Sequence, residues 1–516
     1  MEMDIIAKQK QQTHPSMDNF TCFPSWLLQP AIVLLFSCVF IYTLRRKKSS
    51  MASPNLPPGP HRLPVIGNFH QILVGKNLHQ VLWEFSHKYG PIMLIHLGSQ
   101  PYVIISSSEL ANQVLKTYDH ILNNRPLSKG FERLTFNYMD VAFSPSNDHW
   151  KKMRKVFITE FAGSKRTRFF KNVLDSEVNT MLDSFSSHLL NSTINLEDQI
   201  EHLITDVACK LAVGKSYREG TLVRGKTLKE ILDELVIMLS GSLSDIFPSV
   251  GWILDGLRGW NGRLEQCFSD LDSFLEIVLD EHIDRTESER GDHEKDLIDA
   301  CRSQLTRDEL KSLLMNVING SIDTTTAATI WAVSEIIKNP RVMQKLQGEI
   351  RSCVGRKPRV DESDITQMTY LKLVVKETLR LHPPPFLLVR ECTSHCQIDG
   401  YDILPRTRIL INSWGIGRDP KIWKVDATDF NPERLENVEV DQCEMVPFGG
   451  GRRSCPAANM ATSIIEFTIA SIFYSFDWKI PNEVNNENLD MEQEGFPVVK
   501  RKVPLCLVPM KHNWED

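Results

Sequence analysis

The sequence predicts a mainly α-helical fold with small β-sheets, in which a single large domain follows one N-terminal transmembrane helix. Three observations lead to this prediction. One uncharged apolar segment lies near the N-terminus, apolar residues recur at helical spacing through most of the remaining chain, and β-type runs are short. The length of 516 residues alone would suggest about three domains. We find no internal repeat and no long low-complexity stretch beyond residue 61, so one domain over residues 61–516 is expected.

The composition is that of a folded globular protein, with 42% hydrophobic and 24% charged residues. The formal net charge is −6, whereas a nucleic-acid-binding protein is expected to be basic, so no nucleic-acid partner is predicted. The mean hydropathy of −0.22 argues against several membrane spans. The 11 cysteines show no dense, regular spacing, so most of them are expected to be reduced and buried.

Residues 26–44 are the predicted membrane anchor, because these 19 residues contain no charge. As a helix they would extend about 28 Å, close to the thickness of a bilayer core. Four basic residues, at positions 45–48, follow at once and place the rest of the chain on the cytosolic side. A cleaved signal peptide is the alternative, but its basic residues would precede the apolar stretch. Residues 1–25 are then a short lumenal tail.

Residues 45–60 form a basic and proline-rich hinge that ends in Pro57-Pro58-Gly59-Pro60. Prolines at this density favour a stiff, extended spacer between the anchor and the domain. Met17 is an alternative start, and Asn19 begins a glycosylation sequon on the lumenal side.

Helical spacing of apolar residues predicts six helices within the domain. They are expected over 69–89, 167–190, 228–239, 267–286, 307–338 and 370–381. Short β-type runs predict strands over 92–97, 102–106 and 408–412.

The most informative stretch runs from Phe448 through three glycines to Cys455 and Pro456. Glycines allow a tight turn, and proline suits the first position of a helix, so Cys455 is expected at a helix N-terminus. The helix and nearby Arg453 should favour the thiolate. A thiolate is either a nucleophile or a metal ligand. No histidine lies within 50 residues to act as its base, which favours the metal ligand.

This stretch resembles the haem-thiolate loop of the cytochromes P450, which reads Phe-x-x-Gly-x-Arg-x-Cys-x-Gly. Phe448, Gly451, Arg453 and Cys455 match, whereas Ala457 replaces the final glycine. The resemblance implies that haem b is the cofactor and that Cys455 is the axial ligand of its iron. The methyl group of Ala457 should tighten the contact between the helix and the porphyrin.

Other motifs extend this resemblance over nearly the whole chain. Glu377 and Arg380 match a Glu-x-x-Arg helix motif, and the family would join Arg434 to them in a buried network. The resemblance assigns the two haem propionates to a second group of residues, which would compensate their charge. These residues are Trp150, Arg154, Arg390 and Arg453.

The helix expected over 307–338 contains Gly320, Ser321, Asp323 and Thr324 amid apolar residues. A local bend is one interpretation. The family pattern, Ala/Gly-Gly-x-Asp/Glu-Thr, implies a notch that admits dioxygen, with Asp323 and Thr324 as the catalytic pair that relays protons. Ser321 departs from the second glycine of that pattern.

The resemblance implies a monooxygenase that uses O2 and electrons from NADPH, delivered by NADPH-cytochrome P450 reductase, with cytochrome b5 as a further partner. The catalytic domain would be cytosolic and anchored by a single span to the endoplasmic reticulum membrane. Lys151, Lys152 and Lys155 are a candidate docking patch, and a solvated helix face is the alternative.

The sequence looks closest to plant-specific A-type microsomal P450s, which implies a lipophilic specialised metabolite, with a terpenoid favoured. The expected pocket is lined by apolar residues within 124–143, 315–324, 386–389 and 495–498. A phenylpropanoid or alkaloid hydroxylase is an alternative. So are a haem-thiolate isomerase or dehydratase that needs no reductase, and a non-catalytic haem-binding protein.

Overall fold

The computed structural model describes residues 54–72, 77–163, 166–190, 192–284, 296–424, 426–436, 445–481 and 486–512. The chain divides into two units, residues 1–54 and 55–516, and all elements named below lie in the second unit. The predicted lumenal tail, the span over 26–44 and most of the hinge lie outside the described residues. Within the described residues, no helix is both long and apolar enough to cross a bilayer.

The described part of the chain is mainly helical, as the sequence predicts. Its α-helices are α3 (Phe69–Ile72), α4 (Leu78–Tyr89), α5 (Ser108–Asn112), α6 (Asp119–Leu122), α7 (Lys129–Leu134), α8 (Asp148–Glu160), α9 (Thr167–Ser184), α10 (Leu196–Val213), α11 (Leu228–Leu239), α12 (Gly251–Leu257), α13 (Trp260–Asp284), α15 (Leu297–Cys301), α16 (Arg307–Lys338), α17 (Pro340–Val354), α18 (Glu362–Gln367), α19 (Thr369–Leu381), α20 (Ser413–Ile416), α21 (Pro420–Trp423) and α22 (Ala458–Ser475).

Shorter helical turns and strands complete the secondary structure. The turns are the π-helices η1 (Gln113–Thr117) and η3 (Phe185–Leu189), and the 3-10 helices η4 (Leu243–Asp245), η5 (Pro432–Leu435), η6 (Gly451–Arg453) and η8 (Asn486–Asn488). The strands are β1 (Ile92–Leu97), β2 (Gln100–Ile105), β3 (Ile194–Asn195), β4 (Leu387–Glu391), β5 (Cys396–Ile398), β6 (Tyr401–Ile403), β7 (Arg408–Asn412), β8 (Phe476–Lys479), β9 (Gln493–Glu494), β10 (Lys500–Arg501) and β11 (Cys506–Lys511).

The predicted helices are present, and most differ only at their ends. The bounds of α11 and α16 are those predicted, whereas α13 begins at Trp260, seven residues before the expected start. The helix expected over 69–89 corresponds to α3 and α4, with residues 73–76 between them outside the described residues. The helix expected over 167–190 continues from α9 into the π-helix η3.

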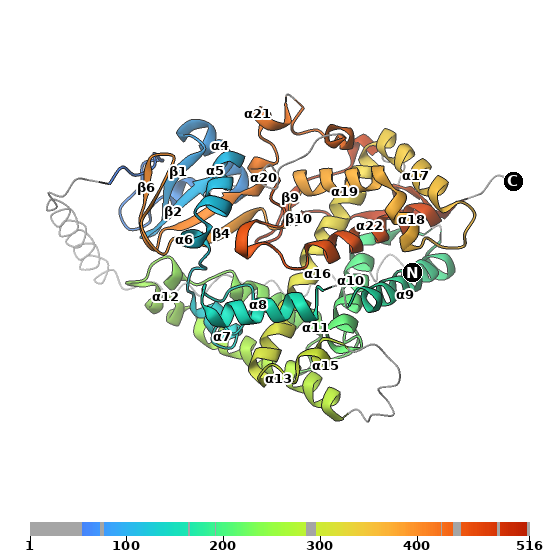
Figure 1. Cartoon of the computed structure of the whole chain (residues 1–516), viewed down its shortest axis with the longest axis horizontal. Helices are drawn as coiled ribbons and strands as arrows, with labels where there is room; N and C mark the ends of the chain where they lie inside the picture. Colours follow the sequence, from blue (N-terminus) through green and yellow to red (C-terminus); the bar gives the residue numbers. More distant parts are fainter. Residues whose placement is uncertain are drawn as a thin grey trace, which may run out of the picture. The chain divides into compact units, whose positions relative to one another are not determined.

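The largest sheet has the strand order β1-β2-β7-β4. β2 and β7 pair in parallel, with Ile104 opposite Leu410, whereas the two outer pairings are antiparallel. One face of the sheet packs against α4 and the other against α5 and η1, so apolar side chains are buried on both faces. Figure 1 shows the sheet with α4 and α5 beside it. Because both faces of the sheet are packed against helices, β4 is held in place. Arg390, which lies on β4, is therefore held in place as well.

Helix α16 crosses the helical region and contacts α10, α13, α19 and α22 along its length (Figure 1). A capping box between Thr306 and Glu309 begins it, and Asn339 followed by Pro340 ends it. Residues on all sides of α16 are buried over most of its length, as expected of a core helix. The Gly-Ser-x-Asp-Thr stretch does not break the helix.

The predicted buried network is present at the junction of α19 and η5. The Arg380 guanidinium donates two hydrogen bonds of 2.7 Å to the Glu377 carboxylate, and the side chains of both residues are fully buried. Arg434 Nε donates to the same carboxylate at 2.8 Å. One buried carboxylate thus neutralises part of two guanidinium charges and ties η5, the segment ahead of the Cys455 loop, to α19.

Candidate functional site

A glycine-rich turn leads into Cys455. Cys455 N–H donates to the Phe448 carbonyl at 2.8 Å and closes the loop, and the thiol itself is exposed. Gly451 has a φ of +65°, and a Cβ at this position would lie 2.3 Å from both Leu115 O and Asp119 Oδ1. A side chain is therefore excluded at Gly451 by backbone conformation and by space.

The surroundings of the Cys455 thiol differ in part from the sequence prediction. Helix α22 begins at Ala458, so Cys455 precedes it by three residues instead of standing at its first turn. Burial on the protein side raises the pKa of the thiol, although the Ala457 N–H and the Arg154 charge oppose this shift. The Ala457 N–H at the N-cap of α22 thus favours the thiolate, as predicted for the helix N-terminus, and the favouring arginine is Arg154 instead of Arg453, but burial outweighs both. A metal ion bound to the sulfur would deprotonate it outright.

The three predicted propionate-binding arginines come together beside the loop. Arg453 donates to the carbonyls of Asn123 and Ser144 at 2.9 and 2.7 Å, and its Nη1 is buried with no hydrogen-bond partner among the described residues. Arg154 donates to the Ser454 carbonyl at 2.9 Å. Arg390 Nη1 donates to its neighbouring carbonyl, that of Val389.

A fourth arginine, Arg125, belongs to the same cluster, and the sequence analysis missed it. Its guanidinium donates to the carbonyls of Ala142 and Val389. Only the segment Asn-Asn-Arg-Pro marks it in the sequence, and no motif spacing relates it to the others. The contact exists because the loop before α7 folds back onto β4, where Glu391 N–H donates to the Asn124 carbonyl at 2.9 Å.

The electrostatics of these four arginines indicate an anion-binding site. Burial lowers the pKa of all four, to about 10 for Arg125 and about 9 for Arg453. Repulsion by the neighbouring guanidinium groups lowers the pKa of Arg390 and Arg453 further, and Asp119 opposes this in part. Clustered buried cations with an unpaired N–H group need negative charge. The two carboxylates of haem fit this requirement, with Cys455 in the adjoining loop.

Trp150 holds two of these guanidinium groups through its ring face. The guanidinium carbon of Arg453 lies 3.8 Å from the ring centre and that of Arg154 lies 5.9 Å from it. The indole N–H already donates to the Val141 carbonyl at 3.1 Å. Trp150 therefore orients the cations, and its N–H is engaged by the protein.

The predicted catalytic pair lies on α16 beside an exposed glycine. Gly320 is exposed, and a Cβ built on it would meet open space within 4 Å. Thr324 Oγ1 donates to the Gly320 carbonyl at 2.8 Å, and Ser321 donates to Val317 O at 2.6 Å. Ser321 thus directs its hydroxyl back along the helix. Asp323 forms an ion pair of 2.7 Å with Lys500, which the sequence analysis did not foresee.

Asn316, one turn before Gly320, fastens the segment before α8 to α16. Its Oδ1 accepts the N–H groups of Val141 and Ala142, and its Nδ2 donates to Asp140 Oδ2. Burial raises the pKa of Asp140, and Asp140 Oδ1 has no partner among the described residues. Sequence reasoning missed this contact because a lone asparagine in an apolar helix gives no signal of its partner.

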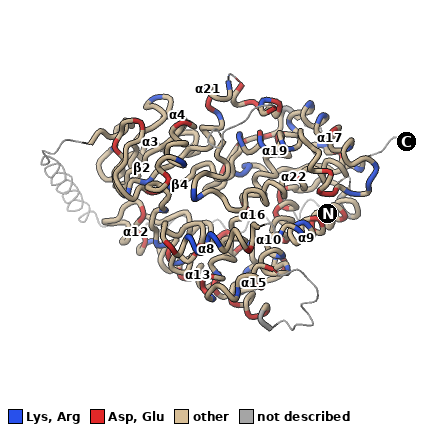
Figure 2. Tube along the Cα trace, viewed as in Figure 1, with Lys and Arg blue, Asp and Glu red and all other residues tan. Residues whose placement is uncertain are grey.

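The candidate basic patch on α8 is partly neutralised. Lys151 pairs with Asp148 at 2.8 Å and Lys152 pairs with Glu309 at 2.7 Å. Lys155 is exposed. Figure 2 shows basic and acidic residues mixed along α8.

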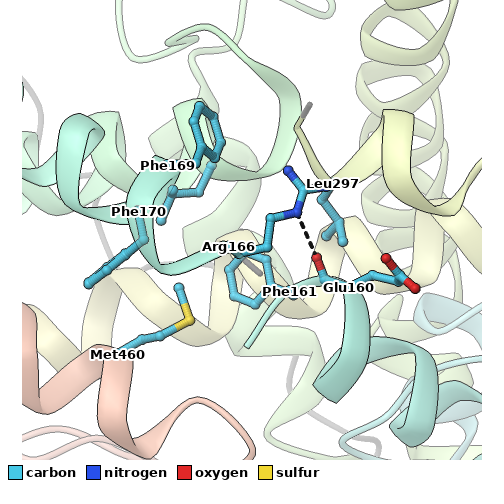
Figure 3. Close-up of a pocket in the computed structure, with 8 residues that line it drawn as sticks. Glu160, Phe161, Arg166, Phe169, Phe170, Leu297 and Met460 are labelled. Carbon is cyan, nitrogen blue, oxygen red and sulfur yellow. Dashed lines mark hydrogen bonds between the residues drawn. The ribbon is translucent and has the colours of Figure 1, made fainter. Parts of the chain in front are cut away.

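Two cavities differ in their relation to the site. The crevice between Glu160, Arg166, Phe170 and Met460 (Figure 3) contains none of the predicted site residues. Its volume of about 10 Å³ leaves room for no more than one water molecule. A cavity of about 200 Å³ lies among α10, α11 and α16, and Asp323 lines it. Two of the segments predicted to line the substrate pocket meet through Phe386 and Phe496, whose ring centres lie 5.8 Å apart.

Comparison with known proteins gives a consistent result over nearly the whole chain. The family model described as Cytochrome P450 matches residues 57–507. The chain is 51% identical over 508 residues to parthenolide synthase of Tanacetum parthenium, covering 96% of this chain and 100% of that protein. It is 51% identical to eupatolide synthase of Helianthus annuus, with coverage of 96% and 99%. Identity to cytochrome P450 71B37 of Arabidopsis thaliana is 40%, with coverage of 93% and 98%.

Proposed function

This chain belongs to the cytochrome P450 family and is a P450 monooxygenase, and from this premise we propose that it hydroxylates a lipophilic plant specialised metabolite, of the terpenoid class, with electrons from NADPH-cytochrome P450 reductase. One observation carries the site assignment. An exposed thiol, Cys455, adjoins a cluster of buried arginines that lacks enough negative charge. Thiolate-ligated haem with two propionates satisfies both features.

The residues divide into those that hold the cofactor and those that serve the reaction. Cys455 would ligate the haem iron, and Arg125, Arg154, Arg390 and Arg453 would bind the propionates. When bound, haem supplies the iron at which dioxygen is activated, and the thiolate ligand supports cleavage of the O–O bond. The protein's own task is to deliver protons and to orient the substrate.

Asp323 and Thr324 are the proposed proton-delivering pair. Adjacent residues on an α-helix point about 100° apart, so the two side chains face different surroundings. Asp323 lines the cavity of about 200 Å³, whereas the Thr324 hydroxyl is held against the helix beside Gly320. This arrangement suits Asp323 as the acid that exchanges protons with water in the cavity. It suits Thr324 as the alcohol that passes those protons on, away from the cavity.

The substrate class rests on apolar side chains and on the relatives. Phe386 and Phe496 contact each other, and Phe131 stacks on Phe143 with 4.4 Å between ring centres. Aromatic and apolar walls suit a lipophilic molecule. Two proteins 51% identical to this chain are named for the products parthenolide and eupatolide, which supports the terpenoid class over the phenylpropanoid and alkaloid alternatives.

We also propose that the enzyme is anchored to the endoplasmic reticulum membrane by residues 26–44, with the catalytic domain in the cytosol. An exposed apolar surface on the domain supports this. On α12, Trp252, Ile253, Leu254 and Leu257 are exposed. Val65 and Ile66 are exposed near Phe69, which stacks on Phe247 just before α12. Apolar patches of this kind mark protein or membrane contacts.

The reductase, with cytochrome b5 as a second donor, would dock on the face that carries the Cys455 loop. Arg452 is exposed within this loop, on η6, and Lys155 is exposed on α8, whose Arg154 donates to the Ser454 carbonyl. Lys376 is exposed on α19, which contacts α22. Such a local basic surface would attract an acidic partner despite the negative net charge of the whole chain.

The deciding experiment is expression in microsomes with reductase, followed by a screen against a panel of plant terpenoids. The reduced carbon monoxide complex should show the red-shifted Soret band of thiolate ligation. Cys455→Ala should lose it, and Cys506→Ala, which removes another exposed thiol, should keep it. A normal band in Cys455→Ala would refute the ligand assignment. Product formed without NADPH or reductase would instead indicate an isomerase or dehydratase, and no turnover would indicate a non-catalytic haem protein.

A further inference from the structure

Lys500 makes the closest described contact to the carboxylate of Asp323. The Lys500 ammonium donates to Asp323 Oδ1 at 2.7 Å, and the two side chains are 34% and 25% exposed. Lys500 lies on β10, 177 positions along the chain from Asp323. The sequence motif around Asp323 gives no indication of this partner.

The position of Lys500 is fixed by its neighbours in the hairpin of β9 and β10. The adjacent Val499 carbonyl accepts the Trp331 indole N–H at 3.0 Å, which ties the strand to α16. Arg501 on the other side is buried, and its Nε donates to the Val503 carbonyl. The same hairpin carries Phe496, which contacts Phe386. Lys500 therefore reaches Asp323 from a backbone held on both sides.

The cavity beside Asp323 is lined by apolar and charged side chains. Besides Asp323 it is lined by Glu201 on α10, by Lys229 and the exposed Asp233 on α11, and by Arg218. At about 200 Å³ it holds several water molecules. Both lining bases are already paired, Lys229 with Glu201 and Arg218 with Asp206, which lies outside the lining.

We propose that Lys500 is a positioning residue for oxygen chemistry: it holds the Asp323 carboxylate at the inner wall of this cavity, so that Asp323 takes up protons from cavity water and passes them toward Thr324. The proposal rests on the proposed monooxygenase function. Each turnover consumes two protons and two electrons with one O2, inserts one oxygen atom into the substrate and releases the other as water. Asp323 returns to the carboxylate after each proton is passed on, and the electrons come from NADPH through the reductase.

The physical reason for this positioning role is that Lys500 limits which partners the Asp323 carboxylate can contact. Lys229 and Arg218 across the cavity are engaged by Glu201 and Asp206, so Lys500 is the cation that fixes the orientation of the Asp323 carboxylate relative to Thr324. The Lys500 ammonium has three N–H donors, so it can hold Asp323 with one and keep the others for water. The charge and hydrogen bond of Asp323 raise the pKa of Lys500 even though burial opposes this, so the lysine stays charged while it acts.

The test compares Lys500→Met, Lys500→Gln and Lys500→Arg with the matched control Lys502→Met, which removes a lysine two residues away that pairs with Glu492. Each haem-loaded variant is first checked for the reduced carbon monoxide band and for the spectral shift on substrate binding. Failure of the wild type in these checks or in turnover would refute the proposed function itself. If one of the two neutral variants, Lys500→Met or Lys500→Gln, folds poorly, the other still provides the measurement.

Lys500→Met and Lys500→Gln should bind substrate as the wild type does, yet form several-fold less product per NADPH and show a larger solvent isotope effect on kcat. Lys500→Arg should recover most of the product yield per NADPH and most of the normal isotope effect. Lys502→Met should match the wild type in both quantities. As a reading independent of activity, Lys500→Met should lower the Tm less in an Asp323→Asn background than alone. Unchanged coupling and isotope effect in the neutral variants, no rescue by arginine, or equal Tm losses in both backgrounds would each overturn the proposal.

Discussion

Arg453 lies over the face of Trp150, with its guanidinium carbon 3.8 Å from the centre of the ring. The two residues come from η6 and α8, 303 positions apart in the sequence. Two of the three guanidinium nitrogens donate to backbone carbonyls, and the third, Nη1, has no partner among the described residues. The stacking thus fixes a cation that keeps one buried N–H donor, which we propose binds an anionic group of the cofactor.

Replacing Arg453 by methionine should weaken haem retention. Loss of a hydrogen bond to a charged group costs about 1.5–3 kcal/mol, or roughly ten- to a hundred-fold in affinity. Arg453→Lys should restore part of the loss, and Arg452→Met, a neighbouring side chain that is 60% exposed, should have little effect. The rate of haem transfer to a scavenger protein measures this. Equal rates for Arg453→Met and the wild type would contradict the propionate role.

Replacing Glu377 by alanine should destabilise the whole domain. The substitution leaves Arg380 and Arg434 buried without their shared carboxylate, and breaking a buried pair in this way costs about 3–5 kcal/mol. Thermal unfolding and the yield of haem-loaded protein give the measurement. The control is Asp148→Ala, because Asp148 and Lys151 have the same i,i+3 spacing but are exposed. Its Tm should match that of the wild type, and a Glu377→Ala protein of normal Tm would refute the expectation.

Asp323→Asn and Thr324→Val should each reduce kcat while keeping the reduced carbon monoxide band. Positioned proton transfer typically contributes on the order of 10²-fold or more to a rate. Product formed per NADPH should fall in parallel, because electrons are consumed without completing the reaction. Thr324→Ser keeps the hydroxyl that donates to Gly320 O and should stay near wild-type coupling. If Asp323→Asn and Thr324→Val both turned over normally, the proton-delivering pair would have to lie elsewhere.

Stability should fall in mild acid because of His79. This residue is 1% exposed between Phe386 and Trp414, and burial lowers its pKa to about 4. The unfolded chain therefore binds this proton at higher pH than the folded chain does. The contribution is fully present above pH about 6.5 and is lost as the pH falls toward 4, up to about 3 kcal/mol.

Thermal unfolding of the wild type and His79→Gln at pH 7 and pH 5 tests this. The variant should lose less stability between the two pH values, although His382, whose pKa burial also lowers, keeps part of the dependence. The exposed His87 serves as a control, since His87→Gln should behave as the wild type does. An identical pH dependence in His79→Gln would rule out His79 as the source.

The apolar surface on α12 should bind membranes even without the N-terminal segment. A protein of residues 55–516 should sediment with phospholipid vesicles, and Leu257→Glu, at a side chain that is 80% exposed, should reduce the bound fraction. Ile158→Glu alters an apolar residue that is 44% exposed on α8 and should leave binding unchanged. Equal loss for the two variants would show that general hydrophobicity, and not this patch, drives the association.

The sequence by itself determined the residues whose partners are close in the chain or whose type admits few roles. The bounds of α16 followed from a continuous apolar pattern closed by Asn339 and Pro340, and the Glu377–Arg380 pair followed from i,i+3 spacing. Cys455 stood out because three glycines, an arginine and a proline surround one cysteine.

Only the tertiary structure decided which distant side chains share one electrostatic environment. Arg125 joins the arginine cluster because its loop folds back onto β4, and Lys500 reaches Asp323 because the last hairpin packs on α16. For the same reason the sequence prediction for the Cys455 thiol missed two influences on its pKa, burial and Arg154 from another helix. Charge and desolvation act through space, so residues far apart in the chain set them together.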